Sequence, residues 1–261
     1  MVDKKNSFID SANELRHWFE TPIGQNYRHA ESALLRAKLK ENFRKEVLQL
    51  DFIGWEEAFH EAMRFAHYTI LDLDTNNSTQ YPRIVGEADN LPIDTYSVDI
   101  VIMPHTLEFA GNPHQVLREV NRVLKPEGII LLMGFNPWAF WHLPRFLPNA
   151  KRRTPWNGRF ISRRRVLDWL KLLNFEIEVS KGVCLLPLLK KDQPREAQSI
   201  VQKMLACVPV IPAAYFIMGV KRVSGGTSIF HLKDLKKRFI PPLIKPATKT
   251  IHVKKKRADL H

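Results

Sequence analysis

Three polar side chains follow candidate buried strands, where they are placed to do chemistry. His105 comes two residues after the largely apolar run Val98–Met103. Asp72 lies near the end of the run Thr69–Leu73, and Glu87 follows a third, shorter apolar run. Histidine has an ordinary pKa of about 6.5, which suits a general base near neutral pH. A carboxylate accepts hydrogen bonds from hydroxyl and amino groups. The pattern therefore predicts a site with one candidate base and two candidate binding acids.

The elements that must position His105 form a strand–helix–strand unit. Val98–Met103 is nearly all apolar and too short for a helix, so it fits a strand buried on both faces. Asn112-Pro113 starts a helix, and the apolar residues from Val116 to Leu124 recur at helical spacing. Lys125–Gly128 then predicts a turn into a second buried strand, Ile129–Met133. Such a unit indicates an open α/β sheet whose ligands lie at the carboxyl ends of the strands.

A longer pattern extends from Arg83 to Asn136. It contains the segments Glu87-Ala88, Leu91-Pro92, Asp99-Ile100-Val101, Leu107 and Pro113, and a Lys-Pro-Glu-Gly turn. In these segments the chain resembles the class I S-adenosylmethionine (SAM) dependent methyltransferases. The resemblance is strong over 83–136, weaker over 46–82 and 160–222, and absent after Val223. It implies a Rossmann-like, doubly wound sheet of seven strands, mostly parallel with an antiparallel last strand, with helices on both faces and SAM as cofactor.

The resemblance also implies roles for the acids at the strand ends. Asp72, or Asp74 beside it, would accept hydrogen bonds from the ribose hydroxyls of SAM. Glu87 would accept one from the adenine amino group, with the backbone N–H of Ala88 nearby. The alternative for each acid is a purely structural place in a turn.

Methyl transfer requires few specific side chains from the protein. Methyl transfer from a sulfonium needs alignment of the acceptor with the methyl group, and a base only if the acceptor atom carries a proton. Candidates lie in the loop after Met103, namely His105, Thr106 and Glu108. His105 is either the catalytic base or a loop histidine that contacts the cofactor or orders the loop.

The turn after the first expected strand departs from the family pattern of one acid and three glycines. Such glycines bring the backbone close to a ligand and offer N–H groups at a helix start. Aligned without gaps, Gln49 replaces the acid, while Asp51, Ile53 and Trp55 occupy the glycine positions and Gly54 is one place out of register. β-Branched Ile53 resists a positive φ. We expect Gln49, Asp51 and Gly54 to contact the cofactor, on a backbone that differs from the family's.

Composition and charge set limits on the rest of the chain. The 261 residues are 44% hydrophobic and 26% charged, as in ordinary globular proteins. Two cysteines supply neither a zinc site nor a disulfide framework, and the N-terminus lacks the apolar core of a signal peptide, so a cytoplasmic location and no metal are expected. The longest apolar stretch, Leu205–Val220, is broken by Pro209 and Pro212 and predicts no transmembrane segment.

The net charge of +13 is concentrated in two segments. Arg145–Arg165 holds eight basic and no acidic residues, and Ser224–His261 holds ten basic and two acidic, which leaves −3 for the remainder. We therefore divide the chain into an N-terminal helical cap (1–44), an α/β domain (45–223) with a basic and aromatic substrate-cap segment (138–165), and a basic tail (224–261). The tail is too polar to bury a core and is expected to be disordered.

Together these features predict SAM-dependent methyl transfer to an unidentified acceptor. The basic segment 138–165 favours an anionic acceptor. One alternative is a degenerate methyltransferase fold that acts as a binding or scaffold module, because the glycines are lost. Another is an RNA-directed methyltransferase, because the tail suits RNA or an anionic membrane surface.

Overall fold

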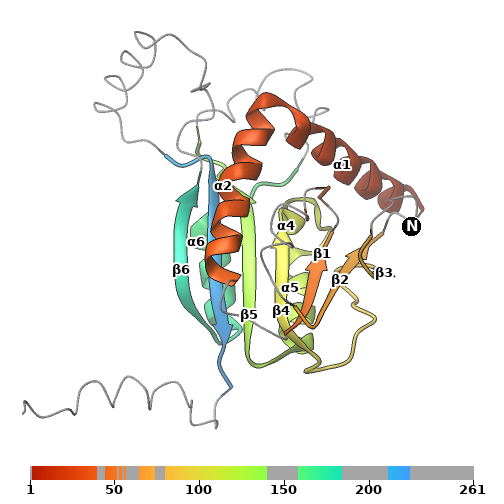
Figure 1. Ribbon diagram of the computed structural model, residues 1–261, viewed down its shortest axis with the longest axis vertical. Helices are drawn as coiled ribbons and strands as arrows, with labels where there is room; N and C mark the ends of the chain where they lie inside the picture. Colours follow the sequence, from red (N-terminus) through yellow and green to blue (C-terminus); the bar gives the residue numbers. More distant parts are fainter. Residues whose placement is uncertain are drawn as a thin grey trace, which may run out of the picture. The chain divides into compact units, whose positions relative to one another are not determined.

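The computed structural model in Figure 1 describes residues 2–39, 45–51, 53–54, 56, 65–73, 80–139, 158–183 and 211–223. The chain divides into two compact units, Met1–Val223 and Ser224–His261. All the described residues belong to the first unit. Trp55, most of the predicted substrate cap (140–157) and the whole basic tail lie outside the described residues, so the predictions for them stay predictions.

A seven-stranded sheet is the centre of the first unit, with the strand order β3-β2-β1-β4-β5-β7-β6. Its strands are β1 (Glu46–Leu50), β2 (His67–Asp72), β3 (Arg83–Val85), β4 (Val98–Pro104), β5 (Leu124–Phe135), β6 (Phe175–Val183) and β7 (Ala214–Lys221). Neighbours from β3 through β5 pair in parallel, and β7 is antiparallel to both β5 and β6. The predicted mostly parallel sheet with an antiparallel last strand is confirmed.

The helix between β4 and β5 begins as its sequence predicts. In α5 (Pro113–Val123) the side chain of Asn112 accepts a hydrogen bond from the backbone N–H of Gln115 at 3.2 Å, and proline occupies the first turn, where a missing N–H costs nothing. A short helix, α4 (Thr106–Phe109), precedes it in the loop after β4. The capping therefore fixes where the chain turns back toward β5.

The predicted turn Lys125–Gly128 is wrong in form, because these residues belong to β5 itself. Val98 of β4 already pairs with Leu124, and the next pairing joins Ile100 to Ile129, so the intervening residues are accommodated as an irregularity in the ladder. Glu127 takes a positive φ of 62° there. The turn residues bend the start of the strand instead of separating it from the helix.

The N-terminal helices are separated by a single residue. They are α1 (Val2–Glu20) and α2 (Pro22–Leu39), with Thr21 between them. Pro22 starts α2, as proline does at a first helical position. Gly24 lies inside α2, where a Cβ would be 2.1 Å from the carbonyl oxygen of Trp18. This glycine therefore permits a close approach of two helices and does not end one.

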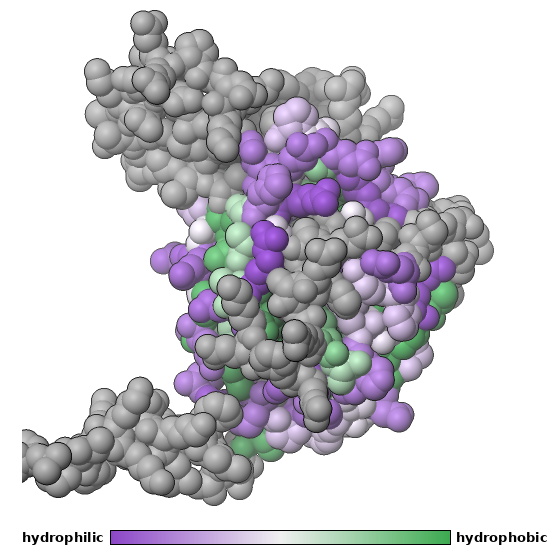
Figure 2. Space-filling view, in the orientation of Figure 1, coloured by the Kyte–Doolittle hydropathy of each residue, from purple (hydrophilic) through white to green (hydrophobic). Residues whose placement is uncertain are grey.

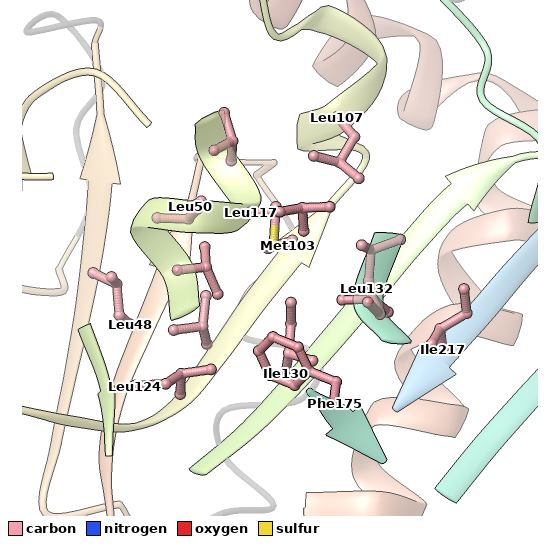
Figure 3. Close-up of a cluster of buried hydrophobic side chains, with 14 of the residues drawn as sticks. Leu48, Leu50, Met103, Leu107, Leu117, Leu124, Ile130, Leu132, Phe175 and Ile217 are labelled. Carbon is pink, nitrogen blue, oxygen red and sulfur yellow. The ribbon is translucent and has the colours of Figure 1, made fainter. Parts of the chain in front are cut away.

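The two faces of the sheet are covered by different helices. Figure 1 shows α2 in front of β5 and β7, with α5 and α6 (Arg163–Leu172) behind the sheet. The hydrophobic cluster on the first face includes residues of α1 and α2, such as Leu15, Phe19 and Leu35. The cluster on the second face joins Leu48 and Ile130 of the sheet to residues of α5 and α6 (Figure 3). The helices on both faces agree with the predicted doubly wound fold.

α1 lies over the edge of the sheet at which β1, β2 and β4 end (Figure 1). Its outer surface is mainly hydrophilic in Figure 2, as expected for a helix that faces water. In the described part of the chain, no helix is both long enough and apolar enough to cross a membrane. The same residues include no group of three or more histidine, cysteine or acidic side chains that could hold a metal ion.

Candidate functional site

The predicted site residues meet at one edge of the sheet. Asp51 follows β1, Asp72 is the last residue of β2, Glu87 follows β3 and His105 follows β4. These strands are parallel neighbours, so their carboxyl ends share an edge, which is where open α/β sheets bind ligands. α1 crosses above this edge in Figure 1. The sequence therefore predicted the position of the candidate site.

The turn after β1 keeps two of the backbone conformations that glycines would supply. Asp51 has a φ of 64° and Gly54 a φ of 82°, whereas Ile53 is not among the residues with positive φ. A non-glycine residue pays a steric cost in this left-handed region, and aspartate tolerates it better than a β-branched residue does. The second positive φ of the turn thus lies at Gly54, one residue after Ile53, where the family pattern has a glycine.

A buried hydrogen-bond network supports that turn from below. The side-chain amide of Gln49 donates to Glu56 Oε1 at 2.7 Å and to the carbonyl oxygen of Asp51 at 2.9 Å, and its oxygen accepts from the Tyr68 hydroxyl. Glu56 Oε1 also accepts from the backbone N–H of Ile53 at 2.7 Å. Burial raises the pKa of the Glu56 carboxyl. Gln49 therefore holds the turn in shape through side-chain contacts.

Asp51 is a buried acid whose charge is disfavoured. Only 9% of it is exposed, and burial raises the pKa of its carboxyl from 3.8 to about 7. A hydrogen bond with the Thr106 side chain opposes the rise, the charge of Asp72 adds to it, and the charge of Arg16 on α1 opposes it. Near neutral pH this side chain exists in both protonation states.

The acids at the ends of β2 and β3 differ in exposure. Asp72 is 3% exposed, while Glu87 is exposed and Ala88 is partly buried. The loop that carries Glu87 is closed by a hydrogen bond from the N–H of Asn90 to the carbonyl oxygen of Glu87 at 3.1 Å. A Cβ on Gly86 would lie 3.0 Å from Pro92, so the Leu-Pro pair noted in the sequence packs against the end of β3.

His105 lies in a fully buried cluster of charged and aromatic groups. Its backbone has a φ of 59°, and its Nε2 lies 3.2 Å from both carboxylate oxygens of Glu31 on α2. Its Nδ1 is 3.6 Å from Glu108 Oε1, too long for a hydrogen bond. The ring stacks on Phe135 at a centroid distance of 4.0 Å. Burial acts to lower the pKa of His105, but the two carboxylates outweigh it and raise the pKa to about 10.

Three residues of this edge were missed by the sequence reasoning: Arg16, Glu31 and Glu56. Glu31 carried a readable signal, because it lies four residues from both Tyr27 and Leu35 on the buried stripe of α2. An acid on the buried face of a helix requires a partner, and that partner is His105. Arg16 and Glu56 carried no such signal, since their neighbours come from other elements.

The described residues fit SAM. Asp72 and Glu87 are hydrogen-bond acceptors of the kind that ribose hydroxyls and an adenine amino group need. At the methionine end, Gly54 leaves the backbone bare, and a Cβ there would lie 3.7 Å from the Arg16 side chain. The N–H of Ile53 is already bonded to Glu56, so this turn differs from one that offers every N–H group to a ligand. The acceptor groups at the ends of β2 and β3 thus match a nucleoside by chemical type, and the turn after β1 has a backbone of its own.

Comparison with known proteins agrees with this geometry. A family model for a methyltransferase domain matches residues 53–132. The chain is 33% identical over 162 residues to the uncharacterized protein YafS of Escherichia coli K12, which is 61% of this chain and 65% of YafS. It is 38% identical over 60 residues to the ubiquinone/menaquinone biosynthesis C-methyltransferase UbiE of Rubrivivax gelatinosus, 23% of this chain and 24% of that protein. The chain thus spans less than two thirds of the length of the curated relatives it matches.

Solved structures extend the likeness of fold. A SAM-dependent methyltransferase from Thermotoga maritima superposes with a TM-score of 0.61 at 18% identity, over 84% of this chain and all of that one. The [4+2]-cyclase SpnF superposes with a TM-score of 0.52 at 14% identity, over 74% of this chain and 80% of that one. The chain thus has the fold of a SAM-dependent methyltransferase, and its residues 53–132 match a methyltransferase domain.

Proposed function

We propose that this protein transfers a methyl group from SAM to an acceptor at the carboxyl edge of its sheet. The observation that carries the proposal is the set of acceptor groups at that edge, with Asp72 and Glu87 at the ends of neighbouring strands beside a turn of positive φ. When bound, SAM supplies an electrophilic methyl group on a sulfonium. Fold alone does not decide chemistry, because SpnF, a cyclase, shares the fold.

The proposed roles of the binding residues follow their positions. Asp72 accepts hydrogen bonds from the ribose hydroxyls, and Glu87 accepts from the adenine amino group beside the N–H of Ala88. Asp51 and Gly54 shape the backbone below the methionine end, and Gln49 holds that backbone through its bond to Glu56. Each role is a proposal carried by chemical type and place in the sheet.

His105 is proposed to order the loop after β4, which is one of the two roles predicted for it. A general base must have a free lone pair at working pH, and a pKa of about 10 keeps this imidazole protonated. Its Nε2 also faces the Glu31 carboxylate and not an open edge. An acceptor that loses a proton would then need a base other than His105.

Several finer predictions made from the sequence remain predictions. The anionic acceptor rests on the segment 138–165, and attachment to RNA or an anionic membrane surface rests on the tail; both lie mainly outside the described residues. The cytoplasmic location and the RNA-directed alternative likewise stay predictions. The scaffold alternative gains one observation, the bond of Ile53 N–H to Glu56, which occupies a group that a ligand could use.

The deciding experiment is a calorimetric titration of the protein with S-adenosylhomocysteine. We expect binding, and we expect Asp72→Asn to weaken it by roughly tenfold to a hundredfold, the cost of a hydrogen bond to a charged group. Asn keeps the size of the buried side chain. The matched control is Asp94→Asn, which removes an exposed acid from the turn before β4 and should change nothing. If the wild-type protein fails to bind at millimolar ligand, the scaffold alternative replaces methyl transfer.

A further inference from the structure

Three ionisable side chains with almost no exposed surface meet where the N-terminal helices cover the sheet. They are Glu31, His105 and Glu108, which are 0%, 0% and 2% exposed. His105 Nε2 is 3.2 Å from Glu31, and His105 Nδ1 is 3.6 Å from Glu108. We name this set the ionic clasp. Its members come from α2, from the residue after β4, and from α4.

The ionic clasp is tied to the surrounding backbone on the sheet side. Glu108 Oε1 accepts a hydrogen bond from the N–H of Phe135, the last residue of β5, at 2.6 Å. The carbonyl oxygen of Glu108 accepts from the N–H of Arg159 at 2.7 Å. Gly134 leaves room for this arrangement, since a Cβ there would lie 2.8 Å from Glu108 Oε1. Glu108 therefore anchors the clasp to the end of β5.

Aromatic rings enclose the clasp on the helix side. Phe135 stacks on the imidazole, and Phe19 of α1 lies 5.5 Å from it between centroids. Trp18 of α1 and Tyr27 of α2 both pack against Phe135, at 5.5 and 5.8 Å. Water is excluded from such a shell, so the attraction between the charges is weakly screened. α1 and α2 thus carry three of these rings, Trp18, Phe19 and Tyr27, together with the charge of Glu31.

The charges around His105 are best balanced when its imidazole ring is protonated. Two carboxylates face one imidazole, and a neutral ring would leave both buried carboxylates without a positive partner. A protonated ring compensates one of them and donates from Nε2 to Glu31. The left-handed backbone of His105 adds a steric cost that only its surroundings offset. The two carboxylates therefore favour the protonated ring.

We propose that Glu31 is a positioning residue that, through the His105 imidazolium, fastens the α1–α2 pair to the loop after β4. Moving these helices away from the carboxyl edge requires parting Glu31 from His105, which exposes two opposite charges at once. The order of that edge therefore depends on a residue of α2 that lies 74 positions before His105 in the chain. The clasp is a property of the folded chain and does not rest on the proposed methyl transfer.

The first test uses the wild-type protein. The imidazole signals followed by NMR should show His105 still protonated at pH 8.5. A His105 that loses its proton near pH 6.5 would overturn the proposal. This measurement needs no variant, so it stands even if the substitutions below disturb folding.

The second test is Glu31→Gln, which keeps the shape and the acceptor oxygen but removes the charge. The pKa of His105 should fall by roughly 1–3 pH units, the usual effect of one adjacent charge. Hydrogen exchange of the backbone amides in α2 should become roughly tenfold faster or more, because the hydrogen bond from His105 loses its charged acceptor. The matched control is Asp10→Asn, which removes an exposed carboxylate from α1 and should change neither quantity.

The two readouts separate the parts of the proposal. A lower pKa with unchanged exchange in α2 would show that Glu31 tunes His105 without fastening the helices, and would overturn the proposal. Unchanged pKa would overturn it as well. Failure of S-adenosylhomocysteine to bind the wild-type protein would remove the proposed function and leave the clasp intact, so the two failures are distinguishable.

Discussion

Asp51 occupies a backbone conformation that glycine adopts without strain. Its φ is 64°, its side chain is nearly buried, and burial raises its pKa to about 7. Asp51→Gly should therefore stabilise the fold at pH 5 by roughly 1 kcal/mol through relief of the left-handed backbone, and by the part of the burial cost that is already present at that pH. We expect a larger gain at pH 8. The folded-state pKa lies above the unfolded value of 3.8, so the wild-type protein loses stability as pH rises from 3.8 through 7.

Urea denaturation at the two pH values measures this gain. Asp51→Asn is the matched control, because asparagine tolerates a positive φ and has no charge. It should abolish the pH-dependent part and leave the backbone cost in place. A loss of stability in Asp51→Gly at both pH values would show that the hydrogen bond with Thr106 outweighs strain and burial.

The same variants bear on the cofactor. The sequence predicts that Asp51→Gly strengthens binding of S-adenosylhomocysteine, because it removes a charge and side-chain bulk from the turn. The structure adds a second reason, because the negative charge of Asp51 is close enough to that of Asp72 for the two to repel each other. Weaker binding would instead indicate that Asp51 accepts a hydrogen bond from the ligand's ammonium group.

At the scale of elements, the junction of α1 and α2 depends on one missing side chain. Gly24→Ala would place a Cβ 2.1 Å from the carbonyl oxygen of Trp18 and 2.6 Å from the Cα of Phe19. These are backbone atoms, so the helices themselves must move. We expect a net loss of up to roughly 2 kcal/mol, because an overpacking cost of roughly 1–3 kcal/mol opposes the gain of about 1 kcal/mol that alanine normally brings to a helix.

Thermal unfolding of Gly24→Ala beside Gly111→Ala tests this point. A Cβ on Gly111 meets nothing within 4 Å, and Gly111 has no positive φ, so that variant should be near neutral. Equal melting temperatures for the two variants would show that α1 and α2 are not held in close contact at Gly24.

The sequence predicted elements best where local chemistry decides them. The cap at Asn112 and the buried strand β4 depend on neighbours in the chain, and both were located from the sequence. The place of Lys125–Gly128 within β5 was not predicted, because an irregularity in the ladder depends on the partner strand β4. The site divides in the same way: strand-end acids follow from topology, whereas the pairing of Glu31 with His105 is tertiary.

At the scale of the whole molecule, the buried charges predict how stability changes with pH. The pKa of His105 is about 10 in the folded state against 6.5 when unfolded, so the folded state binds the extra proton between these values. By linkage, its contribution is fully present below pH 6.5 and is lost as pH rises through 10. The loss is at most about 1.4 kcal/mol per pH unit for one group.

Urea denaturation between pH 6.5 and 9 measures this slope, and His105→Asn is the variant to compare with the wild-type protein. Asparagine tolerates the left-handed backbone at this position and carries no proton that titrates. The variant should be less stable at pH 6.5 and should lose less stability than the wild-type protein as pH rises. The two proteins differ at this one position, so the difference between the two slopes isolates His105. Parallel slopes would mean that Glu31 and Glu108 do not keep the buried imidazole charged.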